Sequence, residues 1–425
     1  IRDPDSDGDN LFLSSILAVD ADTGAYRWHY QTTPRDRWDY TATQQITLAD
    51  LPLGEDGANR RVVMQAPKNG FFYVLDAADG ELISATPFTA QNWTTGQFDE
   101  NGRPELVEEA VDLALYAVVP GPTGAHNWHP MAFNPDTGLV YIPVNEIPFF
   151  YDKTRNVEDS KSFWNIGYDA AAGWPVEYPA GTLDAVRDLD GGSLLAWDPV
   201  KAEPRWAVPF PLPLNGGVLS TQAGLVFQGN KFGEFVAYDA ETGERLWADK
   251  LVGNAAAAPM TYEIDGEQYL SVLSGWGSVS SLIAGFTYGE AKSKEPARVI
   301  TFKLGGDGDM PAALVDNVVR TPQSPMFGEP DQHQLGMQRY AESCHFCHGA
   351  FAVGGGVVPD LRWSALAGNE QAWDLVVREG ALEKQGMVSF AGRLSKEDTD
   401  AIRAYVVQQA WLAVANGDAL PPQDG

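Results

Sequence analysis

The chain has 425 residues, a length typical of two or three domains. Apolar residues make up 44% of the chain, which is enough for a large core. Lysine and arginine total 29 against 58 aspartate and glutamate residues, a net charge of −29. This balance argues against nucleic acid or an anionic membrane surface as a partner, because both would repel the chain. No apolar run approaches the length of a membrane span. The composition therefore suits a soluble protein.

A short unit recurs through roughly the first 300 residues, which are rich in glycine, proline and aromatic residues. Each unit reads as a strand, a tight Asp/Gly turn and a returning strand that carries an aromatic residue. Asp198 and Asp239 are 41 residues apart, the length of one four-stranded blade. The pattern predicts a β-propeller, or part of one, over 1–303. The units lie at 18–24, 74–80, 132–138, 195–199 and 236–243.

The first unit begins close to Ile1, which is not a methionine. A processed, mature start would explain this, and so would a fragment. Five recurring units are fewer than some closed propellers need, and closure normally removes open sheet edges. We therefore expect earlier, N-terminal blades to be missing from this chain.

Two turns in the propeller region carry candidate chemistry. Trp38-Asp39-Tyr40 places a carboxylate between two aromatic residues, where it can act as a general base or ligate a hard cation. An aspartate that only caps its own turn is the alternative. Lys68-Asn69-Gly70 precedes an apolar strand and, taken alone, is a hairpin turn.

The repeat ends before a segment with many prolines, and helical periodicity follows it. Residues 304–332 contain Pro311, Pro322, Pro325 and Pro330, which indicates a linker. Residues 333–425 form the predicted helical domain, with its last helix expected from Ser395 to Val414.

The motif Cys344-His345-Phe346-Cys347-His348 lies in this helical domain. C-x-x-C-H is the pattern in which two thiols bind a haem through thioether bonds and the histidine ligates the iron. Half of a zinc site and a short disulfide loop are the competing interpretations. Zinc would need further ligand pairs, and the chain has only these two cysteines. We therefore predict haem c. Its attachment outside the bacterial cytoplasm predicts a periplasmic protein.

A methionine is expected opposite His348 on the haem iron, because it closes the coordination sphere and raises the reduction potential. Met387 follows the haem motif in the order typical of a small c-type cytochrome, whereas Met337 precedes it. We predict that Met387 is the second iron ligand. Packing in the core is the alternative for both methionines.

The propeller region resembles the quinoprotein alcohol dehydrogenases, and with a cytochrome on the same chain it is most similar to the quinohaemoprotein alcohol dehydrogenases. The resemblance covers essentially the whole chain in the right order. It is carried by 8–12, 19–24, 28–34, 38–41, 65–73, 126–131, 214–217 and 274–277, which include Gly8-Asp9-Asn10, Trp38-Asp39-Tyr40, His126-Asn127-Trp128-His129 and Ser274-Gly275-Trp276-Gly277.

The resemblance implies an eight-bladed propeller that holds pyrroloquinoline quinone and calcium, followed by an all-α c-type cytochrome domain. Asp39 matches the catalytic base and approaches calcium, and Lys68 matches the cationic residue beside the quinone oxygens, where it stabilises developing charge. Asn145, Asn215 and Trp276 match positions that line the cofactor, although Trp276 could be a core residue. His126 and His129 are read as structural, because their spacing gathers no further metal ligands.

The chain also departs from the family pattern. Relatives carry further blades before Gly8, with a glutamate and an asparagine that ligate calcium, a tryptophan that stacks on the quinone and an adjacent cysteine pair. This chain resembles about the C-terminal two-thirds of such an enzyme. Either the sequence is truncated or a separate polypeptide supplies the N-terminal blades.

Two classes of function follow. The first is oxidation of an alcohol to an aldehyde or ketone, with electrons passed to haem c and then to an external acceptor such as a cytochrome or a copper protein. Its substrate could also be a bulkier hydroxylated or heterocyclic compound. The second is a cytochrome-propeller protein that only relays electrons or binds a partner, because its quinone site is incomplete.

Overall fold

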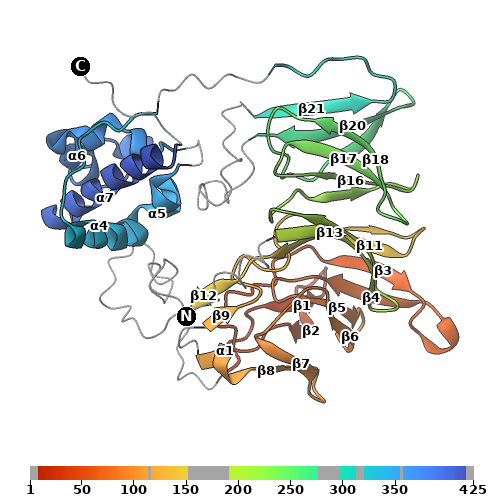
Figure 1. Ribbon diagram of the computed structural model, residues 1–425. Helices are drawn as coiled ribbons and strands as arrows, with labels where there is room; N and C mark the ends of the chain where they lie inside the picture. The colour runs from red at the N-terminus through yellow and green to blue at the C-terminus, as the bar shows by residue number, and fades with distance from the viewer. Residues whose placement is uncertain are drawn as a thin grey trace. The chain divides into compact units, whose positions relative to one another are not determined.

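A computed structural model describes residues 8–112, 116–151, 191–275, 297–312, 320–354 and 358–417. These residues fall into two compact units (Figure 1). The first contains the strands and comprises 8–112, 116–151, 191–274 and 297–310; the second contains the long helices of 320–354 and 358–417. No helix in the described ranges is both long enough and apolar enough to cross a membrane.

Every strand of the first unit pairs antiparallel with its neighbours, and the larger sheets keep the order of the chain. Three described sheets have four strands: β3 (Thr47–Leu51), β4 (Arg60–Gln65), β5 (Phe71–Asp76) and β6 (Leu82–Pro87); β10 (Ala132–Asn134), β11 (Leu139–Glu146), β13 (Gly191–Asp198) and β14 (Glu203–Phe210); and β15 (Val218–Ser220), β16 (Leu225–Gly229), β17 (Glu234–Asp239) and β18 (Arg245–Lys250).

The remaining sheets are smaller. One has three strands, β19 (Met260–Ile264), β20 (Glu267–Ser274) and β21 (Arg298–Lys303). The others are pairs: β1 (Ser15–Val19) with β2 (Tyr26–Gln31), β7 (Thr94–Phe98) with β8 (Pro104–Leu106), and β9 (Tyr116–Val118) with β12 (Phe149–Tyr151). The short helices η1 (Glu55–Gly57) and α1 (Glu108–Asp112) lie between strands.

Burial explains why the strand sequences differ. The central strand β5 reads Phe-Phe-Tyr-Val-Leu and is buried on both faces, so it shows no alternation of polar and apolar residues. The last strand of another blade, β18, is mostly exposed and carries charged residues. Each four-stranded sheet therefore has a buried middle and a solvated outer strand, which is the layout of a propeller blade.

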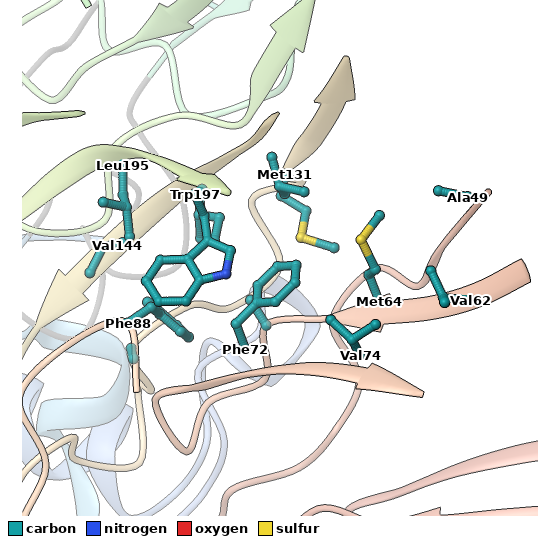
Figure 2. Close-up of a cluster of buried hydrophobic side chains, with 14 of the residues drawn as sticks. Ala49, Val62, Met64, Phe72, Val74, Phe88, Met131, Val144, Leu195 and Trp197 are labelled. Atoms are coloured by element: carbon teal, nitrogen blue, oxygen red, sulfur yellow. The ribbon is translucent and has the colours of Figure 1, made fainter. Parts of the chain in front are cut away.

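Successive sheets pack face to face, and each interface holds its own apolar cluster. Figure 2 shows the cluster between the β3–β6 and β10–β14 sheets, where Phe72 and Met64 meet Trp197 and Met131. The ring centroids of Phe72 and Trp197 lie 5.9 Å apart. Similar clusters join the β10–β14 sheet to the β15–β18 sheet, and that sheet to β20 and β21. The sheets thus follow one another as blades.

The recurring aromatic residue of one sheet packs against a turn of the next sheet. Trp28 on β2 lies on Gly80 in the turn after β5, and Trp206 on β14 lies on Gly243 in the turn after β17. A Cβ on either glycine would lie 2.5 or 2.7 Å from the indole, and both glycines have positive φ, 79° and 75°. The indole nitrogens donate to backbone carbonyls of the same turns at 3.2 and 3.1 Å. Only glycine combines this φ with this close approach.

The second unit is helical. Helices α4 and α7 cross at Gly336, where a Cβ would lie 2.0 Å from the Ala401 carbonyl oxygen. Ser395 caps α7 in a capping box with Asp398. Apolar residues of both helices form one core that includes Cys344. The helices are α4 (Pro330–Ser343), α5 (His345–His348), η5 (Ala350–Ala352), η6 (Leu361–Trp363), η7 (Ala365–Gly368), α6 (Glu370–Val377), η8 (Glu383–Gln385) and α7 (Lys396–Ala415).

Candidate functional site

Asp39 lies in the loop before β3, between two aromatic anchors. Trp38 and Tyr40 are fully buried, and their side chains donate to the backbone carbonyls of Ala110 and Pro120. The carboxylate of Asp36 accepts from the N–H groups of both aromatic residues at 3.0 Å. Asp39 itself has φ 65°, and its side chain is 64% exposed. The loop thus holds one open carboxylate in a left-handed conformation, which outside glycine clusters at functional sites.

Lys68 lies in the turn between β4 and β5 and reaches this carboxylate. Its Nζ donates to the Asp39 carbonyl oxygen at 2.9 Å and to the Asp39 Oδ2 at 3.2 Å. The lysine side chain is only 8% exposed, and Gly124 packs on it so closely that a Cβ there would lie 2.3 Å from the Lys68 Cγ. The fold therefore brings together the two residues predicted as catalytic, with a fixed ammonium on one side of the carboxylate.

The segment 121–130 covers the Lys68 turn. The His126 ring nitrogens lie 2.6 Å from the Ala66 carbonyl oxygen and 2.7 Å from that of His129. Burial lowers the pKa of His126, opposed by these two carbonyls, and burial lowers the pKa of His129 to about 4. His129 is therefore neutral at pH 7, and the His126 contacts are those of a residue that supports a loop.

Asn127 was not among the predicted site residues, and the structure adds it. Its Nδ2 donates to the Thr123 carbonyl oxygen at 2.7 Å, while its buried Oδ1 has no hydrogen-bond partner within the described ranges. A buried acceptor without a donor is costly, so this geometry suits a donor supplied by a ligand. The next residue, Trp128, is 61% exposed. The sequence did contain a signal for Asn127: it lies in the loop before β10, as Asp39 lies in the loop before β3.

The side-chain amides of Asn145 and Asn215 both form hydrogen bonds with backbone groups. Asn145 accepts from the Leu214 N–H at 2.7 Å and donates to the Gly124 carbonyl oxygen at 3.3 Å. Asn215 accepts from the Lys231 N–H at 3.2 Å and donates to the Leu212 carbonyl oxygen at 2.8 Å. Each amide keeps one donor hydrogen for another contact. Their role as cofactor ligands stays a prediction.

Two further predictions concern the quinone and calcium sites. Trp276 lies outside the described residues. Within the described ranges, no group of three or more histidine, cysteine, aspartate and glutamate side chains is arranged to hold a metal ion. Calcium ligation by Asp39 therefore stays a prediction.

The haem motif follows α4: Cys344 caps that helix, and His345–His348 form the short helix α5. Cys344 is buried and Cys347 exposed, and burial raises the pKa of the Cys344 thiol to about 12. His348 is buried, its Nδ1 lies 3.0 Å from the Pro359 carbonyl oxygen, and burial lowers its pKa. A backbone contact at one ring nitrogen fixes the ring and leaves Nε2 for iron, and the neutral form is the one that ligates. The residues present therefore fit a haem.

The second iron ligand is not decided by the packing. Met387 and Met337 are both partly buried against the cluster that contains Cys344. In the same unit, the Trp363 Nε1 and the Tyr405 hydroxyl are buried and find no acceptor in the described part of the chain. Acceptors on a bound haem would satisfy such donors. Met387 as ligand stays a prediction.

Comparison with known proteins agrees with this arrangement. The family model described as glucose/ethanol/alcohol dehydrogenase, beta-propeller domain, matches residues 4–97 and 82–270. A quinohaemoprotein alcohol dehydrogenase of Pseudomonas putida, ADH IIB, is 44% identical over 97% of this chain. The chain belongs to the quinohaemoprotein alcohol dehydrogenases. Its predicted propeller fold is confirmed, and so is the cytochrome domain, because a cytochrome model, cbb3-type cytochrome C oxidase subunit III, matches residues 331–406.

Solved structures of quinohaemoprotein alcohol dehydrogenases are similar along nearly the whole chain. ADH-IIG of Pseudomonas putida has a TM-score of 0.86 at 41% identity and matches 97% of this chain. The enzyme of Comamonas testosteroni has a TM-score of 0.80 at 39% identity and matches 95%. The chain spans 58% of the length of ADH IIB and 60% and 58% of these two structures, so it covers about three-fifths of each relative.

Proposed function

We propose that this protein oxidises an alcohol to an aldehyde or ketone with bound pyrroloquinoline quinone and passes the electrons to a covalent haem c and then to an external acceptor. The observation that carries the proposal is the contact between Lys68 and Asp39, on a chain that also holds the haem motif. When bound, the quinone takes up two electrons from the alcohol, and the haem carries electrons one at a time.

Asp39 is the proposed base. Its carboxylate is open on the side away from Lys68, so it can accept the hydroxyl proton of an alcohol. Lys68 contacts both the carbonyl and the carboxylate of Asp39, which limits the rotation of that side chain. A buried ammonium also places positive charge where negative charge develops during oxidation.

The remaining site residues are proposed to hold the cofactors. Asn127, Asn145, Asn215 and Trp276 would line the quinone, and Asp39 would also approach calcium, a hard cation that prefers oxygen ligands. Cys344 and Cys347 would form the thioether bonds, and His348 and Met387 would ligate the iron. The propeller would occupy 1–303, the linker 304–332 and the cytochrome 333–425.

The proposed location is the periplasm, since c-type haem is attached outside the cytoplasm in bacteria. The proposed partners are a small alcohol and an electron acceptor such as a cytochrome or a copper protein. A net charge of −29 favours an acceptor with a basic docking surface.

The test is a visible spectrum of the protein reconstituted with pyrroloquinoline quinone and calcium, before and after addition of a primary alcohol. Reduced-haem bands on alcohol addition support the proposal. If dithionite reduces the haem and alcohol does not, this chain alone is not a competent dehydrogenase, and by itself it only relays electrons. Repeating the titration with bulkier alcohols then ranks substrates by the rate of haem reduction.

A further inference from the structure

The loop that carries Asp39 also holds a second carboxylate, that of Asp36. The Oδ1 atom of Asp36 accepts from the N–H groups of Trp38 and Tyr40, each at 3.0 Å. Backbone N–H groups that converge on one anion form a nest, which the chain builds with left-handed or turn conformations. Asp39 lies between these two residues and has φ 65°. Its left-handed conformation is therefore part of a nest whose anion is the Asp36 carboxylate.

Asp36 is a fixed group and not a second base. It is 2% exposed, and its other oxygen, Oδ2, accepts from the Ser14 hydroxyl at 2.9 Å. Both oxygens of Asp36 are thus engaged inside the fold, so a substrate does not reach them. The Asp39 side chain, in contrast, is 64% exposed. The loop therefore keeps one carboxylate for structure and presents the other to solvent.

Ser14 is held firmly enough to orient Asp36. It lies directly before β1, and its carbonyl oxygen accepts from the N–H and the hydroxyl of Thr32, both at 2.8 Å. The next residues, Ser15 and Gln31, pair in the register of β1 and β2. Ser14 is buried and has φ 46°, a conformation that is uncommon for serine. Strand pairing thus fixes the hydroxyl that Asp36 accepts from.

The same segment also supports the lysine turn. Asn69, next to Lys68, is fully buried, and its Nδ2 donates to the Thr32 carbonyl oxygen at 3.1 Å. The Lys68 Nζ donates to the Asp39 carbonyl oxygen at 2.9 Å. Asp39 is therefore held by Lys68 at its carbonyl group, and its neighbours are held by Asp36 at their N–H groups. Both supports are joined to the end of β2.

This arrangement explains how the exposed carboxylate keeps its direction. A left-handed residue other than glycine costs free energy and persists only where its surroundings enforce it. We propose that Asp36, oriented by Ser14, is a positioning residue of the dehydrogenase site: it enforces the left-handed conformation of Asp39 and thereby sets the direction of the Asp39 carboxylate. This inference rests on the proposed function, which makes Asp39 the base.

Single-turnover stopped-flow measurements on the reconstituted protein test the inference. The rate constant of alcohol-driven haem reduction reports the geometry of the base, whereas the amplitude reports the fraction of competent protein. Asp36→Ala should lower the rate constant roughly 100-fold at full amplitude, the loss expected for a misplaced reacting group. Asp36→Asn should retain most of the rate, because its Oδ1 accepts from the same N–H groups and its amide can donate to the Ser14 hydroxyl. Ser14→Ala should lower the rate constant roughly 10-fold.

Asp239→Ala is the matched control. The Asp239 Oδ1 accepts from the N–H groups of Glu241 and Thr242 at 3.0 and 2.9 Å, in the turn after β17. Its loss removes a similar carboxylate cap from another blade, so the rate constant should stay at the wild-type value. A wild-type rate constant in Asp36→Ala, or a loss confined to the amplitude, would overturn the inference. If Asp36→Ala does not fold, the same two quantities in Ser14→Ala decide.

Hydrogen exchange tests the nest without turnover. Mass spectrometry of peptides that span 37–41 follows the amides of Trp38 and Tyr40 in the cofactor-free protein. These amides should exchange faster in Asp36→Ala and at the wild-type rate in Asp36→Asn. Unchanged protection in Asp36→Ala would show that Asp36 does not hold the loop, and would overturn the inference. Wild-type haem that alcohol does not reduce would count against the proposed function instead, and the exchange result does not depend on that outcome.

Discussion

The ammonium of Lys68 holds Asp39 at two atoms, the backbone carbonyl oxygen at 2.9 Å and Oδ2 at 3.2 Å. The lysine is buried and the aspartate side chain is open, so the pair has one face fixed by the protein and one face free. This asymmetry suits a general base, because Lys68 fixes the position of the Asp39 carboxylate while its exposed side remains accessible to a substrate.

Asp39→Asn should lower alcohol-driven haem reduction by a factor on the order of 10² to 10⁴, because the amide cannot accept the hydroxyl proton. Asparagine tolerates a left-handed conformation, so the loop with φ 65° should persist. Stopped-flow spectra of the haem measure the rate. Reduction by dithionite is the control and should be unchanged. A variant that turns over at the wild-type rate would exclude Asp39 as the base.

Gly124→Ala should displace Lys68 and thereby slow alcohol oxidation. The new Cβ would lie 2.3 Å from the Lys68 Cγ, and φ is 81°, so we expect a stability loss of roughly 1–3 kcal/mol from overpacking and backbone strain. Gly138→Ala is the matched control, because its φ is 69° and nothing lies within 4 Å. It should lose stability and keep the rate. Equal rates in both variants would contradict the role of the Lys68 contact.

Asn145→Ala tests whether this asparagine holds a loop or a ligand. Without Oδ1 the buried N–H of Leu214 loses its acceptor, so the free energy of unfolding should fall by about 1–3 kcal/mol in the absence of cofactor. Chemical denaturation of the cofactor-free protein measures this loss. Unchanged stability together with a raised Kd for the quinone would instead identify a cofactor ligand.

Met387→Ala should lower the reduction potential of the haem, because loss of the thioether ligand removes the group that raises it. Axial ligands tune haem potentials over about 0.8 V, so the shift should be easily measured by redox titration. Met337→Ala is the control, since Met337 packs against the same core cluster. If only the Met337 variant changes the potential, the ligand assignment is reversed.

The stability effect of Lys231→Met should depend on pH in the cofactor-free protein. The pKa of Lys231 falls from 10.5 to about 8 on folding, so between these values the unfolded chain binds more protons and wild-type stability rises with pH. Below pH 8 the buried charge of Lys231 lowers the free energy of unfolding of the wild type, and the methionine variant has no such charge. The advantage of the methionine variant should therefore shrink by roughly 3 kcal/mol between pH 8 and 10.5. His129, with a pKa of about 4, does not titrate in this range.

Denaturation curves of both proteins at pH 7, 8, 9 and 10 measure this difference. Lys201→Met, at an exposed site, should show no such trend. A difference between wild type and Lys231→Met that stays constant with pH would mean that Lys231 keeps its ordinary pKa in the folded state.

Local patterns were enough to predict the elements whose physics is local. The Asp/Gly turns recur because a left-handed glycine is needed wherever a strand reverses tightly, and Gly80 and Gly243 carry that signal in the sequence. The C-x-x-C-H motif consists of the short helix His345–His348 and its N-cap Cys344, so its chemistry is readable from five consecutive residues. The last helix was expected from Ser395 to Val414, and it runs from Lys396 to Ala415 with Ser395 as its N-cap.

The sequence by itself therefore determined the blade repeat, the haem motif and the family to which the chain belongs. The tertiary structure decided which residues meet: Lys68 reaches Asp39, and Asn145 and Asn215 hold neighbouring loops. These relations join residues of different loops and blades, and their distances depend on how strands pair and sheets stack. Hydrogen bonds and burial act through space, whereas turn and motif patterns act along the chain.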